Sequence, residues 1–568
     1  MKLCTLKGMV KKMKGKRNKE NKEKKSNWLV KFIKVAVFII LVGLVINIAP
    51  NYIQDKNKSK TSLIINNNNV TDSLKYDVLV DENDVVYLSS KDIANFFDGN
   101  IYYDNVYDQI ITTSDSKVAT IGLNKKEMYV NSSKVNIYAT AKKQDGTFYL
   151  PFSEMNKIYN VEIKYSKDGK IVTIDSLEKE QKMGNSSKEA NVKYKPTIFS
   201  KTVAKVKAGE SVVVLKEENG WYKIRTSNGN IGYLKDVANI YKTRDNMEEE
   251  KQIEGKVSLV WDYYTRTAPT RTGTINGINV VSPSVAKLKD EGEGELSIRI
   301  GDEGVDYINW AHQNGYKVWG MIQSDGVIET TSKILNDYKL REKLINNIVK
   351  LAVSYSLDGV NIDFEYMKET DKDMFSRFII ELSPRLKEYG KVLTVDVTAP
   401  DGSPEWSLCY NRYKIAQVAD YIIFMAYDQN GISSPKEGTT AGADWVEVNV
   451  KKFLGQEGVS KDKLILAMPF YTRLWKETST GVTSSTVLMK SIDSTLPEGV
   501  EKVWDNDLKQ YYVEYTQNGT TYKMWLEEEN SIKAKFDIMN KYELAGAAYW
   551  QKDFESSNIW NIVSENIK

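Results

Sequence analysis

Two carboxylic acids stand two residues apart in segment 357–366, which has the sequence LDGVNIDFEY. Alternate side chains of a β-strand point to the same side, so Asn361, Asp363 and Glu365 share one face, and apolar residues occupy the other. Burying carboxylates is costly unless they are paired, and two neighbouring acids lose their protons at different pH values. The pattern therefore indicates acid catalysis, in which one acid is protonated beside an ionised one. The alternative is an edge strand whose acids are solvated.

The segment before this strand predicts the element that positions it. Residues 340–352 place Leu340, Leu344, Ile348 and Leu351 at helical spacing, with polar residues between them. This spacing predicts an amphipathic helix with one apolar face. A helix followed by a strand, repeated along the chain, is the pattern that a parallel α/β barrel requires.

Four segments carry a resemblance to glycoside hydrolase family 18, the chitinase and endo-N-acetylglucosaminidase group. They are 358–365 (DGVNIDFE, similar to the family's DGxDxDxE strand), 421–428 (YIIFMAYD), 464–473 (LILAMPFYTR) and 544–550 (LAGAAYW). They follow the family's order from about residue 255 to the C-terminus. Four further strands are expected at 257–262, 278–282, 317–322 and 391–397. Eight strands suit an α/β fold of the (β/α)₈ TIM barrel type, whose catalytic groups lie at the carboxyl ends of the strands.

The resemblance implies a retaining reaction in which the N-acetyl oxygen of the substrate attacks the anomeric carbon. It implies that Glu365 is the general acid and base. It also implies that Asp363 orients the acetamide N–H and stabilises the positive charge that develops there. Tyr427 is expected to hydrogen-bond the acetamide oxygen, and Trp550 to lie under the sugar ring.

Five further residues are expected to bind substrate: Asn361, Asp428, Met425, Tyr471 and Arg473. For all of these except Asn361, packing or another structural role is the alternative. The commonest family pattern has Asp at position 361, and an Asn there can hydrogen-bond Asp363 but cannot share a proton with it. A similar Asn occurs in members that resemble spore-cortex-lytic and other bacterial wall glucosaminidases, which favours peptidoglycan as substrate. Asp358 lies on the opposite strand face and is expected to be structural.

The N-terminal region combines a basic flank with an apolar run. Residues 1–27 carry eleven Lys or Arg against two Glu, and 28–49 are apolar apart from two lysines. This pattern predicts a retained transmembrane anchor, with a cleaved signal peptide as the alternative. Residues 1–27 are then cytoplasmic, residues 50–72 form a stalk, and the rest is extracellular. The expected product is a single-pass protein of the cell membrane.

Two small domains are expected between the stalk and the barrel. Residues 73–175 contain an internal repeat, in which 87–93 match 149–155, and resemble the copper amine oxidase N-terminal-like α+β domain. This implies no bound copper, because the segment has no His or Cys. Residues 191–241 resemble a bacterial SH3 domain, a small β-barrel. Charged linkers are expected at 176–190 and 242–254, and the barrel at 255–568.

The two aromatic residues Trp221 and Tyr233 bear on what the SH3 domain does. They are expected either to bind the cell wall or to form the core of the small barrel. The assignment rests on the GWYKI and GY elements of this segment.

Composition excludes several classes of function. The net charge of +3 over 568 residues argues against nucleic acid as the main partner. His312 is the only histidine, so neither a histidine-rich zinc centre nor a Ser-His-Asp triad is expected, and no metal or cofactor is predicted. Cys4 and Cys409 fall on opposite sides of the predicted membrane, so no disulfide is expected.

The sequence therefore predicts an exported, membrane-anchored hydrolase that cleaves β-1,4 linkages after N-acetylglucosamine in peptidoglycan. Its expected partners are this polysaccharide, the cell wall through the SH3 domain and the membrane through the anchor. One alternative is a chitinase that acts on chitin or chito-oligosaccharides. The other is a glycan-binding protein without activity, which the retained Glu365 argues against.

Overall fold

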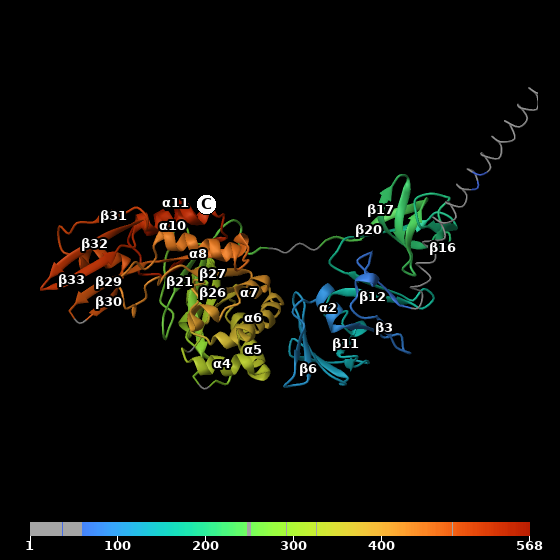
Figure 1. Cartoon of the computed structure of the whole chain (residues 1–568), viewed down its shortest axis with the longest axis horizontal. Helices are drawn as coiled ribbons and strands as arrows, with labels where there is room; N and C mark the ends of the chain where they lie inside the picture. The colour runs from blue at the N-terminus through green and yellow to red at the C-terminus, as the bar shows by residue number, and fades with distance from the viewer. Residues whose placement is uncertain are drawn as a thin grey trace, which may run out of the picture. The chain divides into compact units, whose positions relative to one another are not determined.

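The computed structural model describes residues 34, 37, 60–246, 251–290, 292–324, 326–479 and 481–567. The chain divides into two compact units, and Figure 1 labels their elements. The larger unit comprises residues 97–137 and 249–568, and the smaller one the described parts of 1–96 and 138–248. The predicted cytoplasmic segment 1–27 and nearly all of the predicted anchor 28–49 lie outside the described residues. Within the described ranges, no helix has the length and apolar character to cross a membrane.

The larger unit is built on a closed barrel of eight parallel strands, which confirms the predicted (β/α)₈ fold. The strands are β21 (Val257–Asp262), β22 (Val280–Leu288), β24 (Lys317–Gln323), β25 (Gly359–Asp363), β26 (Val392–Val397), β27 (Tyr421–Met425), β28 (Leu464–Pro469) and β34 (Gly546–Trp550). Strand β23 (Leu296–Ile298) is added antiparallel to β22. The barrel closes because β21 pairs with both β22 and β34, so the carboxyl ends of all eight strands meet at one rim.

Helices cover the outer face of the barrel. They are α3 (Glu303–Gln313), α4 (Ile328–Asn336), α5 (Tyr338–Ser354), α6 (Lys372–Lys387), α7 (Arg412–Val418), α8 (Ala443–Gly455), α10 (Glu529–Lys541) and α11 (Ile559–Asn566). The amphipathic helix expected at 340–352 is α5. It buries Leu344, Ile348 and Leu351 against the strands, as its spacing predicts.

The lumen of the barrel has its own apolar core. Trp261, Trp319 and Met321 are almost completely buried there, and Tyr427 and Trp550 pack against this cluster. Aromatic side chains each bury roughly 150–250 Å² and fill such a space with few groups. The lumen core therefore supports the residues at the rim from below.

A five-stranded antiparallel sheet is inserted between β28 and β34, which the sequence did not predict. Its strands are β29 (Tyr471–Thr478), β30 (Gly481–Leu488), β31 (Val503–Asp505), β32 (Gln510–Gln517) and β33 (Thr520–Trp525). A fully buried ion pair, Lys535 Nζ to Glu527 Oε2 at 2.9 Å, anchors it to α10, and Gln510 Nε2 donates to Glu527 Oε1 at 2.6 Å. Because β29 starts directly after β28, this sheet stands at the rim where the strands end.

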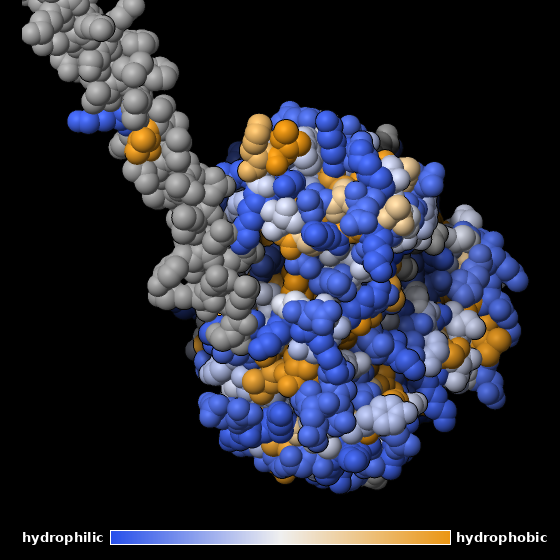
Figure 2. All heavy atoms as spheres, turned by 90° about the vertical axis from the view of Figure 1, so that its right-hand side faces the viewer, coloured by the Kyte–Doolittle hydropathy of each residue, from blue (hydrophilic) through white to orange (hydrophobic). Residues whose placement is uncertain are grey.

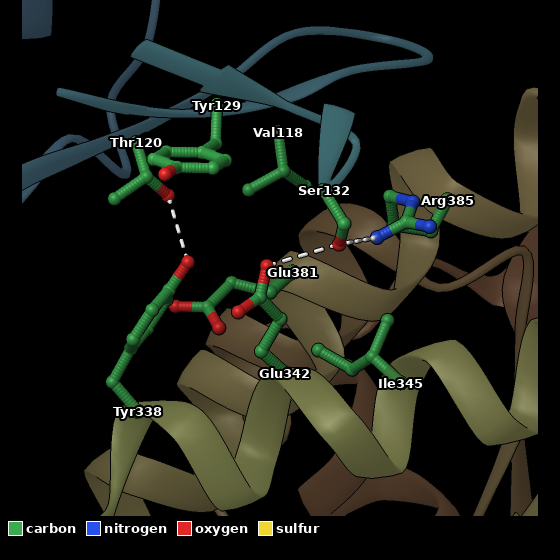
Figure 3. Close-up of a pocket in the computed structure, with 9 residues that line it drawn as sticks. All are labelled: Val118, Thr120, Tyr129, Ser132, Tyr338, Glu342, Ile345, Glu381 and Arg385. Carbon is green, nitrogen blue, oxygen red and sulfur yellow. Dashed lines mark hydrogen bonds between the residues drawn. The ribbon is translucent and has the colours of Figure 1, made fainter. Parts of the chain in front are cut away.

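A second antiparallel sheet, from residues 97–137, belongs to the larger unit. It comprises β5 (Tyr102–Asp104), β6 (Gln109–Thr113), β7 (Val118–Gly122), β8 (Glu127–Val130) and β9 (Ser133–Asn136). Figure 3 shows the small pocket between this sheet and helices α5 and α6, where Thr120 Oγ1 and Tyr338 Oη are 3.1 Å apart and Arg385 donates to Ser132 at 3.2 Å. None of its lining residues belongs to the motif strands, so this pocket is a packing interface on the outer layer.

The smaller unit contains three sheets. Two of them have the strand orders β12-β13-β1-β2 and β10-β11-β4-β3, and the third has the order β16-β15-β19-β18-β17-β14-β20. The strands are β1 (Ser62–Ile65), β2 (Asn68–Asn69), β3 (Leu79–Val80), β4 (Val86–Ser89), β10 (Lys142–Gln144), β11 (Thr147–Pro151), β12 (Val161–Ser166), β13 (Ile171–Ser176), β14 (Gln181–Ser186), β15 (Ala190–Lys193), β16 (Thr202–Val206), β17 (Ser211–Glu218), β18 (Trp221–Arg225), β19 (Ile231–Leu234) and β20 (Val237–Arg244). The two copies of the repeat pair with each other, because β4 and β11 are antiparallel neighbours.

The expected stalk and both expected linkers overlap strands. The predicted stalk 50–72 includes β1, whose residues Leu63 to Ile65 are buried beside the parallel strand β13. The predicted linker 176–190 includes β14, which pairs with β17 and β20. Both segments are rich in polar residues, yet each contributes enough inward side chains to complete a sheet. The linker predicted at 242–254 begins within β20.

The core of the SH3 domain is aliphatic. It is formed by Val192, Val206, Val212, Val214, Ile224 and Leu234. Trp221 and Tyr233 are only partly buried and do not belong to this cluster, and the Tyr233 hydroxyl donates to Glu218 at 3.2 Å. The face drawn in Figure 2 is largely hydrophilic, with apolar residues in small separate patches. Such scattered residues are ordinary at a protein surface.

Candidate active site

Strand β25 positions the two acids that the sequence singled out. Val360, Ile362 and Phe364 are completely buried in the outer core between the strands and the helices. Because strand side chains alternate, Asn361 and Asp363 are turned into the lumen, where they are 0% and 4% exposed. Glu365 stands two residues after Asp363, the last residue of β25, and is half-buried at the rim. The acids thus stand where the barrel opens, as predicted.

Asp363 accepts a hydrogen bond from a neutral side chain on the neighbouring strand β24. Gln323, the last residue of β24, donates Nε2 to Asp363 Oδ2 at 2.9 Å, and its Oε1 accepts from Arg299 Nη1 at 3.0 Å. The other oxygen, Asp363 Oδ1, is buried and has no hydrogen-bond partner among the described residues. A buried acceptor without a partner is rare and calls for an explanation, and a donor from a bound ligand would supply one.

The two acids have different protonation behaviour. Burial and the adjacent Asp363 raise the pKa of Glu365 well above the ordinary value, and Asp396 and Asp428 raise it further. Burial also raises the pKa of Asp363, but the hydrogen bond from Gln323 and the contact with Glu365 act in the opposite direction. Glu365 is therefore the acid that keeps its proton, and Asp363 is the one that ionises first. This arrangement suits proton donation beside a fixed negative charge.

Asn361 lies beneath this pair. The sequence suggested a hydrogen bond from Asn361 to Asp363, but the structure gives Asn361 other partners. Its Oδ1 accepts from Trp261 Nε1 at 2.8 Å, and its Nδ2 donates to Thr394 Oγ1 at 3.0 Å and Asp396 Oδ1 at 2.7 Å. The indole of Trp261 can only donate, which fixes the orientation of the amide. Asn361 is completely buried and both of its N–H groups are used within the protein.

Aromatic residues surround the acids. Tyr427 follows β27, and its ring centroid lies 6.2 Å from that of Tyr471. Burial, Tyr471 and the nearby carboxyls raise the pKa of the Tyr427 hydroxyl well above its usual range, so it remains a hydrogen-bond donor. Trp550 ends β34, with ring centroids 5.6 Å from Trp261 and 5.8 Å from Tyr263.

Three of the other predicted residues gather beside the acids. Asp428 Oδ1 accepts from the Tyr471 hydroxyl and from Arg473 Nη2, both at 2.8 Å. Tyr471 and Arg473 lie at the start of β29, so the inserted sheet delivers them to the rim. Asp428 therefore has partners within the protein, and its charge also contributes to the raised pKa of Glu365. Met425, the last residue of β27, is 6% exposed.

Some residues of this neighbourhood were not anticipated. Gln323 and Asp396 both contact the acid strand, and the Tyr410 hydroxyl donates to the carbonyl oxygen of Phe364 at 2.8 Å. A signal for Asp396 existed, because it is the only charged residue in the strand segment 392–397, whose other residues are apolar apart from Thr394. Gln323 directly follows the strand predicted at 317–322 and ends the observed strand β24. Neither residue lies in one of the four segments that resemble the family.

The opposite end of β25 has a separate polar cluster. Asp358 accepts from the backbone N–H of Val318 at 2.9 Å and contacts His312 Nε2 at 2.8 Å and Lys317 Nζ at 3.3 Å. These residues lie at the amino end of the strand, away from the rim. Over the parts of the chain that the structure describes, no cluster of three or more His, Cys, Asp or Glu side chains is suited to hold a metal ion.

Comparison with known proteins gives three matching families. Residues 263–555, slightly more than half of the chain, match the glycosyl hydrolases family 18. Residues 188–237 match the bacterial SH3 domain, and residues 64–174 match the copper amine oxidase N-terminal domain. All three resemblances noted in the sequence are thus found.

The chain is also similar to individual proteins. The chain is 24% identical to the uncharacterized glycosylase YvbX of Bacillus subtilis over 47% of its own length and 80% of the relative's. It is 22% identical to the cortical fragment-lytic enzyme of Bacillus anthracis over 42% of its length, which spans little more than half (56%) of that enzyme. A solved chitinase from Chromobacterium violaceum shares 21% identity over 55% of this chain and 99% of that one, with a TM-score of 0.48. The chain belongs to glycosyl hydrolase family 18 and is a glycosidase.

Proposed function

We propose that this protein is an exported, membrane-anchored glycosidase that cleaves β-1,4 linkages after N-acetylglucosamine in peptidoglycan. The observation that carries the proposal is the pair formed by Glu365, which keeps its proton, and Asp363, which has a buried oxygen without a partner. A substrate acetamide N–H would satisfy that oxygen. An ionised Asp363 would then stabilise the positive charge that the acetamide acquires.

The proposed reaction has two steps. Glu365 donates its proton to the glycosidic oxygen while the bond from this oxygen to the anomeric carbon breaks, and the acetamide oxygen bonds to that carbon from the other face. The resulting oxazolinium carries one positive charge next to Asp363. A water molecule then attacks the anomeric carbon, gives a proton to Glu365 and opens the oxazolinium ring. Because the anomeric carbon is displaced twice, its configuration is retained. Tyr427 would hydrogen-bond the acetamide oxygen, and Trp550 would lie under the ring.

The choice of peptidoglycan rests on features outside the barrel. The bacterial SH3 domain has partly buried aromatic residues outside its core, Trp221 and Tyr233, which suit contacts with glycan or peptide. The basic segment 1–27 followed by the apolar run 28–49 favours an anchor that keeps the enzyme next to the cell's own wall. The relative from Bacillus anthracis is a cortical fragment-lytic enzyme. A chitinase is the second candidate, because the barrel motif of the family does not by itself separate chitin from peptidoglycan.

Incubation with purified peptidoglycan and, separately, with chitin tests the substrate. We expect soluble fragments from peptidoglycan whose masses and reducing ends identify N-acetylglucosamine at the newly formed end. Fragments that end in N-acetylmuramic acid, or release from chitin alone, would contradict the proposed specificity. The same incubations are repeated with a variant that lacks the bacterial SH3 domain. Comparison with the full chain shows how far cleavage depends on binding to the wall.

A further inference from the structure

A third buried carboxyl lies beside the two acids and has no part in the proposed steps. Asp396 is on β26, is 2% exposed, and accepts from Asn361 Nδ2 at 2.7 Å. In the parallel pairing of β25 with β26, Asn361 lies opposite Thr394 and Ile362 opposite Val395. Continuing this register by one residue sets Asp396 opposite Asp363. Neighbouring strands are about 4.8 Å apart, so the two carboxyls are close neighbours in the lumen.

Asn361 links Asp396 to the site in a fixed orientation. Trp261 donates to the amide oxygen, so Asn361 must present its N–H groups to β26. Three other titratable groups act electrostatically with Asp396. They are Asp363 at the end of β25, Glu365 just after it, and Tyr427 just after β27. All are acids, and none supplies a positive charge.

We propose that Asp396 is a positioning residue of the active site, which supplies from β26 the second acid that the commonest family pattern places at position 361 on β25. This inference rests on the proposed glycosidase function. Two buried carboxyls on adjacent strands cannot both ionise without a large cost. Asp363 accepts a hydrogen bond from Gln323 and its charge acts on Asp396, so the negative charge settles on Asp363 first. Once Asp396 also ionises, its charge helps to hold the proton on Glu365, the group that must donate it.

The electrostatics agree with this geometry. Burial and the charge of Asp363 raise the pKa of Asp396 well above the ordinary value. Asp396 in turn contributes to the raised pKa of Glu365. Removing the Asp396 carboxyl should therefore lower the pKa of Glu365, so that the enzyme loses its proton donor at a lower pH.

Asp396→Asn is the sharp test, because an Asn at this position keeps an oxygen that can accept from Asn361 Nδ2. At acidic pH we expect the kcat/KM of this variant to be near that of the unaltered full chain. On the basic side of the pH profile we expect it to be about tenfold lower, because a decrease of one unit in the pKa of Glu365 lowers activity there tenfold. The double variant Asn361→Asp/Asp396→Asn returns an acid to β25 and should restore the basic-side activity. Rates are measured on purified peptidoglycan or on chito-oligosaccharides, whichever the unaltered chain hydrolyses.

A purely structural role for Asp396 makes different predictions. It predicts either no change or the same factor of loss at every pH, and no restoration by the double variant; any of these results would overturn the inference. Asp371→Asn is the matched control. Asp371 is a buried carboxyl of the same unit that accepts from Asn336 at 2.8 Å outside the site, and its variant should leave the pH profile unchanged.

Thermal unfolding supplies a readout that needs no activity. The pKa of Asp396 is raised on folding, so the folded chain keeps a proton that the unfolded chain releases, and stability falls as pH rises between the two pKa values. The Asn variant lacks this loss, so it should gain stability relative to the unaltered chain as the pH is raised. If no substrate is cleaved but this difference appears, the proposed function fails and the assignment of Asp396 as a buried acid stands. An unchanged pH dependence of unfolding overturns the assignment.

Discussion

Replacing Glu365 with Gln should lower kcat/KM by about 10²–10⁴-fold, the range that a positioned general acid contributes. Gln has nearly the same shape and half-buried position, but it has no proton to give to the leaving oxygen. Glycan affinity should persist, because the aromatic residues and Asp363 remain in place. Initial rates on peptidoglycan fragments and calorimetric binding to the same fragments measure the two quantities separately.

Glu369→Gln is the matched control for this variant. Glu369 lies on the same loop after β25, in the short helix Glu369–Asp371, and its side chain is exposed. It should hydrolyse the fragments at the rate of the unaltered chain. Turnover by the Glu365 variant within a few-fold of the control would remove Glu365 from the role of proton donor.

Replacing Asp363 with Asn should lower kcat by about 10²–10³-fold, the loss typical of removing one charge-stabilising group. The Asn oxygen can still accept from Gln323, so the fold should be retained. A neutral amide cannot balance the positive charge of the oxazolinium, however, so the loss should fall on kcat more than on KM. A thiazoline analogue of that intermediate should inhibit the unaltered chain competitively and the Asn variant more weakly.

The thiazoline result separates two reaction routes. Inhibition that weakens in the Asp363 variant agrees with an attack by the substrate's own acetamide. A chain that hydrolyses its substrate but is not inhibited by the thiazoline would instead require a protein nucleophile, and Asp363 would be the first candidate. Thermal unfolding of both variants checks that the barrel is intact.

The period of two in strand 359–363 was enough to predict which side chains enter the lumen. Alternation is a local property, so it gave the positions of Asn361 and Asp363 directly. The partners of these residues come from other strands, and the choice of Asp396 rather than Asp363 as the acceptor for Asn361 depends on the register between β25 and β26. A single sequence contains no direct signal for that register.

Other differences have the same origin in long-range contacts. The residues that became β1 and β14 were expected in polar linkers. The apolar run of β1 is only three residues long within the polar segment 50–72, and β14 is itself largely polar, so only their pairing partners identify them as strands. Tyr471 and Arg473 were placed after the seventh strand without knowledge of the inserted sheet. The structure shows that they begin β29 and hold Asp428 at the rim.

The dependence of kcat/KM on pH in the unaltered full chain tests the central claim most directly, because that claim concerns which of two adjacent acids keeps its proton. Glu365 must be protonated, so activity should be lost as pH rises through a pKa that burial and Asp363 have raised well above the ordinary value of about 4.3. Asp363 must be ionised, so activity should also fall as pH is lowered through its own pKa. A bell-shaped profile with a basic side far above the range of an ordinary carboxyl is the predicted result. Activity that has already declined by the pH at which an ordinary glutamic acid ionises would contradict the account.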